Sequence, residues 1–404
     1  MKRGLLAAVL LIANSAYAGS TFKVLRSFHC DPSGCGPTGG LVLDDEGNLY
    51  GTTGGGGDAD ATIFRLSLSS GGRWTYDLLY TLTIKQGSAV EPSLTLDSAG
   101  NLYGTSINGG THDVGSVFEL SPDPTTPEGW TLNVLHSFLN SHQDGSGPWD
   151  KVILDKAGSL YGTTREGGTN GGGIVFKLAP GTGASWTETI LHDFPATPRD
   201  GGLSYAELVQ DRLGDLYGAT SGGGTGNGKG TVFKLTHTAS GWKETLLHSF
   251  QGPDGSQPIA GLIFDAKGNL YGTTQVGGAN GEGTVFELTP TADGRWKHTI
   301  LYDFPQFRNG GGPVSTLAFD KAGNLYGTAA GGMGPCSGGC GVVYKLTPGT
   351  DGKWTYSVLH RFTDKGDGAE PNGAVVFDKT GTHLYGTAIF GGTYNQGVVY
   401  EITP

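Results

Sequence analysis

The sequence predicts an all-β protein folded as a seven-bladed β-propeller, with four antiparallel strands in each blade. Three observations lead to this prediction. The chain has 74 glycines and 19 prolines and only 16% charged residues, a composition that argues against a helical protein. A Leu-Tyr-Gly tripeptide recurs along all 404 residues, with its Tyr at 50, 103, 161, 217, 271, 326 and 385, which indicates tandem repeats. The two chain ends supply complementary parts of one repeat.

Each repeat contains four segments with the character of strands. The first is short, apolar and followed by Asp, as in residues 41–44, and the second is Leu-Tyr-Gly-Thr-Thr or a close variant. A tight turn rich in Gly and Asn joins them, since these residues accept the positive φ of hairpin turns. The third alternates apolar and polar residues, as in 284–288, which is typical of a half-buried strand. The fourth begins at a Trp and ends at an aromatic residue or Leu, as from Trp242 to Phe250.

The chain ends predict that the ring closes on itself. The last repeat stops after its third strand, at residues 398–404, and lacks a fourth. Residues 19–28 align with the fourth-strand segment 241–250 and end, like it, in Phe. We therefore expect an N-terminal strand, about residues 20–28, to complete the last blade of a single propeller domain over residues 19–404.

The repeated motifs resemble a known family. Units of the form Gly-Asn-Leu-Tyr-Gly-Thr-Thr, Gly-Thr-Val-Phe-Lys-Leu and Leu-Leu-His-Ser-Phe are similar to those of the GloVer-type choice-of-anchor tandem-repeat family of exported bacterial proteins. The resemblance covers about residues 22–404 and implies a repeat architecture and export. It implies no particular activity. No hydrophobic tail precedes Pro404, so surface attachment is not predicted from the resemblance.

The first residues have the features of a secretory signal peptide. Lys2 and Arg3 precede an apolar run over 5–13, and Ala16-Tyr17-Ala18 is a cleavage-site pattern. We expect cleavage near Ala18 and secretion of residues 19–404 to the periplasm or the extracellular space. The apolar run is too short to cross a bilayer, and no later segment is long enough, so we expect no membrane span.

The formal net charge of −11 argues against nucleic acid and anionic membranes as partners, because no basic stripe accompanies it. We expect a monomer. The four cysteines, Cys30, Cys35, Cys336 and Cys340, are expected to form disulfides in an oxidising compartment. The local pairs are the simplest assignment, although spacing alone leaves the connectivity open.

No cofactor or metal site is assigned from the sequence. Neither cysteine pair has the Cys-x₂-Cys spacing of a zinc site, and no loop follows an EF-hand or P-loop pattern. A structural Ca²⁺ in the Gly-rich loops remains an alternative.

Features shared by all repeats are interpreted as scaffold. The Asp that follows each first strand is expected to accept backbone N–H groups in an Asx-type turn. Four histidines, at 136, 192, 248 and 360, share one fourth-strand register with Arg26, Tyr80 and Tyr302. That register favours a packing position over four separate general bases.

Residues that break the repeat on the Gly-rich loop face are the candidates for function. Trp149 is the one Trp outside the fourth-strand position, and Tyr205 occupies the equivalent position in the next repeat. The neighbouring loops carry unusually many polar side chains, namely His112, Asp113, His142, Gln143, Asp144, Arg165, Glu166, Arg199 and Asp200.

Three functions fit these residues. In a binding module for an extracellular carbohydrate or peptide, Trp149 and Tyr205 would present flat faces, with hydrogen bonds from His112, His142, Asp144, Arg165 and Glu166. In a polysaccharide lyase, Arg165 would neutralise a uronate carboxylate while His142 or Tyr205 removes the α-proton. In a structural or adhesive surface protein, the loops would form no discrete site. No fixed catalytic signature is present, so the binding module is favoured and no catalytic residue is assigned.

Overall fold

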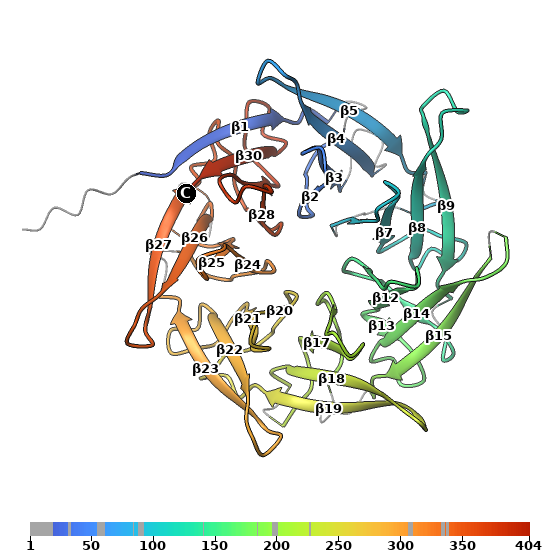
Figure 1. The fold of residues 1–404 in the computed structure, drawn as a ribbon, viewed down its shortest axis with the longest axis vertical. Helices are drawn as coiled ribbons and strands as arrows, with labels where there is room; N and C mark the ends of the chain where they lie inside the picture. The colour runs from blue at the N-terminus through green and yellow to red at the C-terminus, as the bar shows by residue number, and fades with distance from the viewer. Residues whose placement is uncertain are drawn as a thin grey trace, which may run out of the picture.

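The computed structural model describes residues 19–30, 34–54, 61–83, 85–87, 93–139, 141–183, 185–195, 201–225, 228–305, 310–332, 336 and 339–404. The predicted signal peptide, residues 1–18, and the loop residues Arg199 and Asp200 lie outside these ranges. The described chain forms a closed ring of seven four-stranded sheets, as predicted (Figure 1). It contains no helix with the length and apolar character needed to cross a membrane.

The blades share one strand order, from the axis of the ring to its rim. The innermost strands are β2 (Val42–Leu43), β6 (Thr95–Leu96), β11 (Ile153–Leu154), β16 (Val209–Gln210), β20 (Ile263–Phe264), β24 (Ala318–Phe319) and β28 (Val376–Phe377). The second strands are β3 (Leu49–Thr53), β7 (Leu102–Ser106), β12 (Leu160–Thr163), β17 (Leu216–Thr220), β21 (Leu270–Thr274), β25 (Leu325–Ala329) and β29 (Leu384–Ala388).

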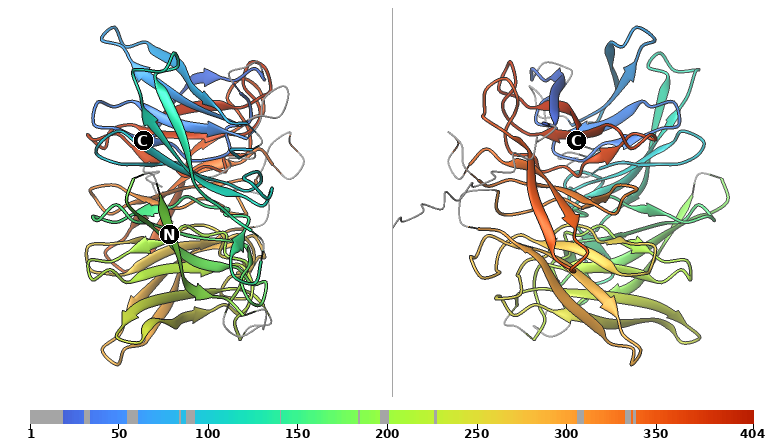
Figure 2. Two further views of the ribbon diagram at one scale, coloured as in Figure 1. Left: turned by 90° about the vertical axis from the view of Figure 1, so that its right-hand side faces the viewer. Right: turned by 60° about the vertical axis from the view of Figure 1, so that its left-hand side comes forward.

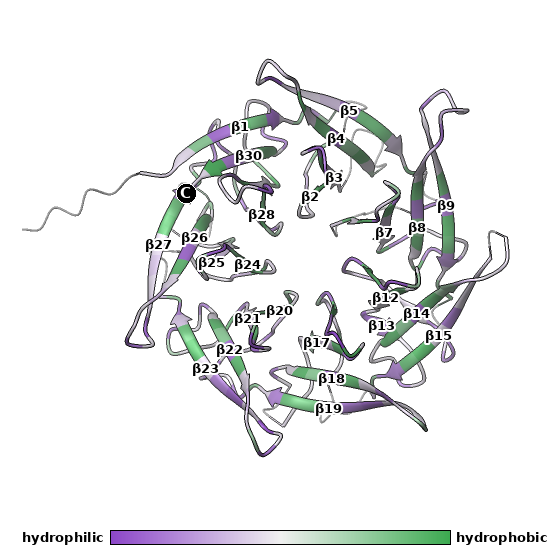
Figure 3. Ribbon diagram, viewed as in Figure 1, coloured by the Kyte–Doolittle hydropathy of each residue, from purple (hydrophilic) through white to green (hydrophobic). Residues whose placement is uncertain are grey.

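The outer half of each blade holds the longer strands. The third strands are β4 (Thr62–Leu68), β8 (Ser116–Pro122), β14 (Ile174–Pro180), β18 (Thr231–Thr238), β22 (Thr284–Pro290), β26 (Val342–Pro348) and β30 (Val398–Thr403). The rim strands are β5 (Trp74–Thr81), β9 (Trp130–Ser137), β15 (Trp186–Asp193), β19 (Gly241–Ser249), β23 (Trp296–Asp303), β27 (Trp354–Arg361) and β1 (Thr21–Ser27). Figure 3 shows hydrophobic and hydrophilic residues alternating along several of these strands.

The first hairpin of each blade explains the repeated Asp and Tyr. In blade one, Asp44 Oδ1 accepts the N–H groups of Glu46 and Asn48 at 3.0 and 2.8 Å, and Oδ2 accepts the Tyr50 hydroxyl at 3.0 Å. Burial acts to raise the pKa of Asp44, but these hydrogen bonds outweigh it and leave that pKa below its ordinary value. The Asx-turn interpretation is confirmed.

The core lies between the blades. One cluster, for example, joins Tyr103 and Val117 of blade two to Val152, Leu160 and Phe176 of blade three. Within blade one, the Gly of Leu-Tyr-Gly leaves room for the Phe64 ring of the next strand, because a Cβ on Gly51 would lie 2.6 Å from that ring. Seven sheets therefore stack around the axis through shared apolar faces, and Figure 2 shows them twisted in the edge-on view.

The ring closes through strands from opposite ends of the chain. Strand β1 pairs antiparallel with β30, with Thr21 opposite Thr403 and Ser27 opposite Val398. The resulting sheet has the order β1-β30-β29-β28. The prediction that the N-terminal segment completes the last blade is confirmed.

Candidate functional site

A cavity of about 1520 Å³ runs along the axis of the ring. Residues from all seven blades line it, from the innermost strands and the segments that enter them. We call it the axial cavity. Trp149 and Tyr205 both line it, immediately before β11 and β16.

Trp149 and Tyr205 meet at the wall of this cavity. Their ring centroids lie 5.3 Å apart with an interplanar angle of 79°, an edge-to-face pair. Both side chains are half-buried. The same position in other described repeats holds Thr38, Ile259, Val314 or Asn372, so the aromatic pair belongs to blades three and four.

Arg165 joins this pair from the connection after β12. Its guanidinium carbon lies 5.3 Å from the Tyr205 ring centroid and 5.9 Å from that of Trp149. Such distances permit cation–π attraction to both rings. Its Nε is 3.5 Å from Glu166 Oε1, and 38% of the Arg165 side chain is exposed.

Local strand pairing positions Arg165. The short strands β10 (Gly145–Ser146) and β13 (Glu166–Gly167) pair antiparallel, and the Arg165 N–H donates to the Gly147 carbonyl at 3.0 Å. Gly147 has a φ of 60°, which turns the chain toward Pro148 and Trp149. The entry segment of blade three therefore lies beside its own second connection, and Arg165 is brought to Trp149.

Three charged residues that the sequence analysis did not single out lie next to the aromatic pair. Lys151 Nζ forms an ion pair with Glu207 Oε1 at 3.0 Å, and Asp150 Oδ1 accepts the Lys151 N–H at 2.7 Å. Burial, followed by the negative charge of Glu207, raises the pKa of Asp150 to about 7. All three line the axial cavity.

Comparison of the repeats could have identified Lys151 and Glu207 as candidate site residues. At the position of Lys151 and Glu207, the other repeats carry small residues, namely Gly40, Ser93, Gly261, Thr316 and Ala374. The departure from the repeat at Trp149 and Tyr205 therefore extends two residues further along the chain, to Lys151 and Glu207, which also line the cavity.

The cavity wall also holds unusual backbone conformations. Leu203 and Gln257 both have a φ of 55°, at a position where other repeats place Gly36, Gly147 or Gly312. The left-handed conformation costs a non-Gly residue about 1–2 kcal/mol. Both side chains line the axial cavity, and Leu203 is exposed. Glu370 has a φ of 54° at the same position of blade seven without lining the cavity, so the left-handed conformation belongs to this repeat position and not to the cavity wall alone.

His142 and Glu166 lie elsewhere. They border a second hollow of about 460 Å³, together with Ser141 and residues 167–171, and none of these described residues lines the axial cavity. His142 Nδ1 is 3.2 Å from the Thr169 carbonyl oxygen, and the His142 side chain is exposed. The contacts of His142 therefore do not include Tyr205.

Asp144 and His112 also lie apart from the aromatic pair. Asp144 is 2% exposed, and its carboxylate accepts the N–H groups of Leu139 and Gly145 at 2.9 and 2.6 Å. His112 is exposed on the connection between β7 and β8, and within the described chain no hydrogen bond, ion pair or ring contact joins it to Trp149, Tyr205 or Arg165. The structure therefore brings Trp149, Tyr205 and Arg165 together, with Glu166 next to Arg165, and places His112, His142 and Asp144 apart from the aromatic pair.

The four register-sharing histidines lie between neighbouring rim strands. His248 stacks on His298 with centroids 4.3 Å apart, and His360 stacks on Phe22 at 3.7 Å. Tyr302 stacks on Tyr356 at 4.1 Å in the same manner. We call these paired positions the interblade belt. The interpretation of this register as a packing position is confirmed for these contacts.

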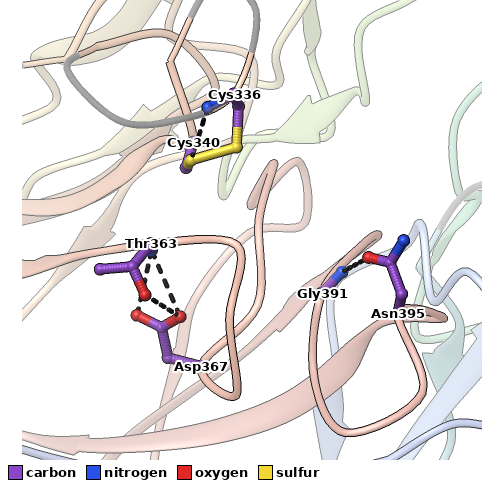
Figure 4. The surroundings of a disulfide bond; sticks show 6 residues. All are labelled: Cys336, Cys340, Thr363, Asp367, Gly391 and Asn395. Atoms are coloured by element: carbon purple, nitrogen blue, oxygen red, sulfur yellow. Dashed lines mark hydrogen bonds between the residues drawn. A yellow bond between two sulfur atoms is a disulfide. The ribbon is translucent and has the colours of Figure 1, made fainter.

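The cysteines form two local disulfides, Cys30–Cys35 and Cys336–Cys340. Figure 4 shows the second pair near the Thr363–Asp367 and Gly391–Asn395 hydrogen bonds of two neighbouring segments. Disulfides are consistent with an exported protein.

The repeat itself identifies the chain. The profile of the Gloeobacter/Verrucomicrobia repeat matches residues 60–263 and 227–404. The chain belongs to this repeat family. The resemblance inferred from the motifs is confirmed.

No curated protein is similar to the chain in sequence. Among solved structures, it is similar to the extracellular domain assigned to a one-component system of B. thetaiotaomicron, at 12% identity and a TM-score of 0.54. That match covers 91% of this chain and 39% of the other, so this repeat protein spans well under half of that structure.

Two further structures are similar over almost their whole lengths. A protein of unknown function from Dyadobacter fermentans has 12% identity and a TM-score of 0.49, with 95% of this chain and 98% of that chain covered. A luciferin-regenerating enzyme has 14% identity and a TM-score of 0.44, with 96% of each covered. The match to the B. thetaiotaomicron domain, at 12% identity, shows a likeness of fold alone.

Proposed function

We propose that this repeat protein is an exported binding module that takes a carbohydrate at the Trp149–Tyr205 wall of the axial cavity. One observation carries the proposal. Trp149, Tyr205 and Arg165 come from three separate segments, all depart from the repeat, and converge on one another. In the other blades whose residue at this position is described, the scaffold uses Thr, Ile, Val or Asn there.

The chemistry of the wall suits a sugar. Half-buried aromatic rings offer flat apolar faces for the C–H side of a pyranose ring, and polar groups nearby can fix its hydroxyl groups. The Arg165 guanidinium offers planar donors that match a carboxylate, and the Lys151–Glu207 pair adds charged groups of both signs. Acidic sugars such as uronates fit this combination best.

A glycan array with the protein of residues 19–404 tests the proposal, followed by calorimetry with each sugar that binds. Trp149→Ala should weaken binding at least about 30-fold, because removing a central aromatic contact commonly costs about 2 kcal/mol. Val314→Ala, at the equivalent position of blade six, is the matched control and should leave the affinity unchanged.

Two results would overturn the carbohydrate proposal. One is absence of binding across neutral and acidic glycans, and the other is unchanged affinity in Trp149→Ala. Binding on a peptide array without any glycan binding would assign the wall to a peptide ligand and also reject the sugar.

The adjacency of Arg165 and Tyr205 favours a second candidate, a polyuronate lyase. Arg165 would hold the carboxylate while Tyr205, in its deprotonated form, takes the proton α to it. The C–H electron pair would form the C=C bond as the glycosidic C–O bond at the β-carbon breaks, and the leaving oxygen would take up the proton from Tyr205 or from water. His142, the other base considered from the sequence, lies at the second hollow. Ultraviolet absorbance of an unsaturated product, abolished in Tyr205→Phe, tests this candidate.

A further inference from the structure

At the position of the interblade belt between blades two and three, a histidine meets two carboxylates. His136 on β9 faces Glu188 on β15, and Asp144 in the connection between the blades reaches the same point. We propose that His136, Asp144 and Glu188 form a binding site for a divalent metal ion of the zinc type. The site lies at the rim of the ring, apart from the proposed sugar site.

The distances fit a small tetrahedral ion. His136 Nε2 is 3.4 Å from Asp144 Oδ2 and 3.7 Å from Glu188 Oε2, and one ligand atom from each residue lies within 4.8 Å of the others. Ligands bound about 2.1 Å from a tetrahedral zinc ion lie about 3.4 Å apart. The two separations from His136 therefore already lie close to the value that zinc requires.

The ligand types also suit zinc. Imidazole nitrogen combined with carboxylate oxygens binds Zn²⁺ and related transition-metal ions. Ca²⁺ takes six to eight oxygen ligands at longer distances, so three protein ligands with one nitrogen suit it poorly. A water molecule would complete the tetrahedron, since three protein ligands leave one position open.

The polar atoms of the site are incompletely paired without an ion. The Asp144 and Glu188 side chains are only 3% and 16% exposed. Glu188 Oε1 is buried and has no hydrogen-bond partner among the residues that the structure describes. An unpaired buried carboxylate oxygen next to a second carboxylate is costly, and a cation between them would remove this cost.

The surrounding backbone holds one ligand in place. Leu139 and Gly145 donate their N–H groups to the two carboxylate oxygens of Asp144, which fixes the orientation of that group. Outer hydrogen bonds of this kind are a regular feature of metal sites, because they orient the ligands before the ion binds.

Other positions of the belt are similar in part. Between blades three and four, His192 Nε2 lies 3.5 Å from Glu244 Oε2, and Asp200, which follows His192 at the spacing of Asp144 after His136, lies outside the described residues. Between blades six and seven, His360 contacts Asp367 at 3.1 Å, but its other neighbour is Phe22, so a third ligand is missing. Between blades four and five, His248, Asp254 and His298 gather, but the two imidazole rings stack within 9° of parallel. Parallel rings direct their in-plane lone pairs side by side, so a shared ion would require one ring to turn.

The test is a calorimetric titration of the metal-free protein, residues 19–404, with Zn²⁺ and in parallel with Ca²⁺. The double variant His298→Phe, Glu244→Gln serves as the parent. The first change removes the second histidine cluster and copies the His360–Phe22 contact, and the second removes the carboxylate that faces His192. We expect one Zn²⁺ per chain and a raised unfolding temperature. Adding Glu188→Gln, which is isosteric, should weaken zinc binding at least about 100-fold and abolish the temperature shift.

Asp367→Asn in the same parent is the matched control, since it changes a belt carboxylate that has no third ligand. It should leave zinc affinity unchanged. Circular dichroism of each metal-free variant separates loss of the site from loss of the fold, and His136→Asn provides a second variant if Glu188→Gln does not fold. Weak or absent zinc binding by the parent, or a preference for Ca²⁺, would overturn the proposal. So would a zinc affinity equal to that of the parent in folded Glu188→Gln and folded His136→Asn.

Discussion

Trp149 meets Tyr205 edge to face, with ring centroids 5.3 Å apart, across the boundary between blades three and four. The two residues occupy one repeat position in successive blades, so the ring geometry itself makes them neighbours. Arg165 then lies within cation–π distance of both rings. Residues one repeat apart in the chain, Trp149 and Tyr205, therefore form one wall of the axial cavity together.

The planar guanidinium of Arg165 should matter more than its charge alone. If the wall binds a uronate, Arg165→Lys keeps the charge but loses the paired donors and the ring contact, so affinity should fall about tenfold or more. Calorimetry with a uronate and a neutral sugar of equal length measures this. Equal losses for both sugars would argue against a carboxylate contact with Arg165.

Gly272 should not tolerate even a methyl group. A Cβ there would lie 2.7 Å from both the Phe286 ring and Leu262 Cδ2, so Gly272→Ala should lower the free energy of unfolding by about 1–3 kcal/mol. Urea unfolding measures the loss. Gly366→Ala is the control, because no atom lies within 4 Å of its added Cβ and the residue is exposed. Equal stability of the two variants would contradict the packing argument.

Closure of the ring should depend on Phe28. Phe28 is fully buried beside Phe64, and it follows the rim strand β1 that completes blade seven. Phe28→Ala should cost about 3–5 kcal/mol, whereas Thr21→Ala, an exposed change on the same strand, should cost little. Thermal unfolding compares them. A small effect of Phe28→Ala would mean that the ring holds without the N-terminal strand.

The first-hairpin aspartates should make the fold sensitive to acid. Asp378 accepts the N–H groups of Thr382 and His383 at 2.8 and 3.2 Å, and Thr380 and His383 contact its other oxygen. Burial acts to raise the pKa of Asp378, but the hydrogen bonds of Thr380 and His383 dominate and lower it from 3.8 to about 2. A lowered folded-state pKa stabilises the fold above the unfolded-state value, and that stability is lost as pH falls from about 4 to 2.

Asp378→Asn isolates this contribution. The variant should unfold at a lower temperature than the wild type at pH 7, and the two curves should converge as pH approaches 2. Thermal unfolding measured across this range gives the difference directly. A difference independent of pH would show that the Asp378 charge contributes no stability.

Much of the architecture could be predicted from the sequence because its determinants are local. Asp44 and Tyr50 lie within one hairpin, Gly51 contacts Phe64 within one blade, and alternation along each strand fixes which side faces the core. The match of residues 19–28 to other rim strands predicted the closure with β30, since a missing strand can be read from the repeat itself.

The candidate sites depended on contacts between loops, which the repeat does not specify. Pairing of β10 with β13 brings Arg165 to Trp149 and separates both from His142. The same connection turns Asp144 inward, toward His136 and Glu188 on two different blades. The sequence by itself determined the strands, the turns and the seven-fold ring, because short-range hydrogen bonds and apolar periodicity repeat in every unit. Only the tertiary structure decided which unique side chains meet, because that depends on how each loop folds against the neighbouring blade.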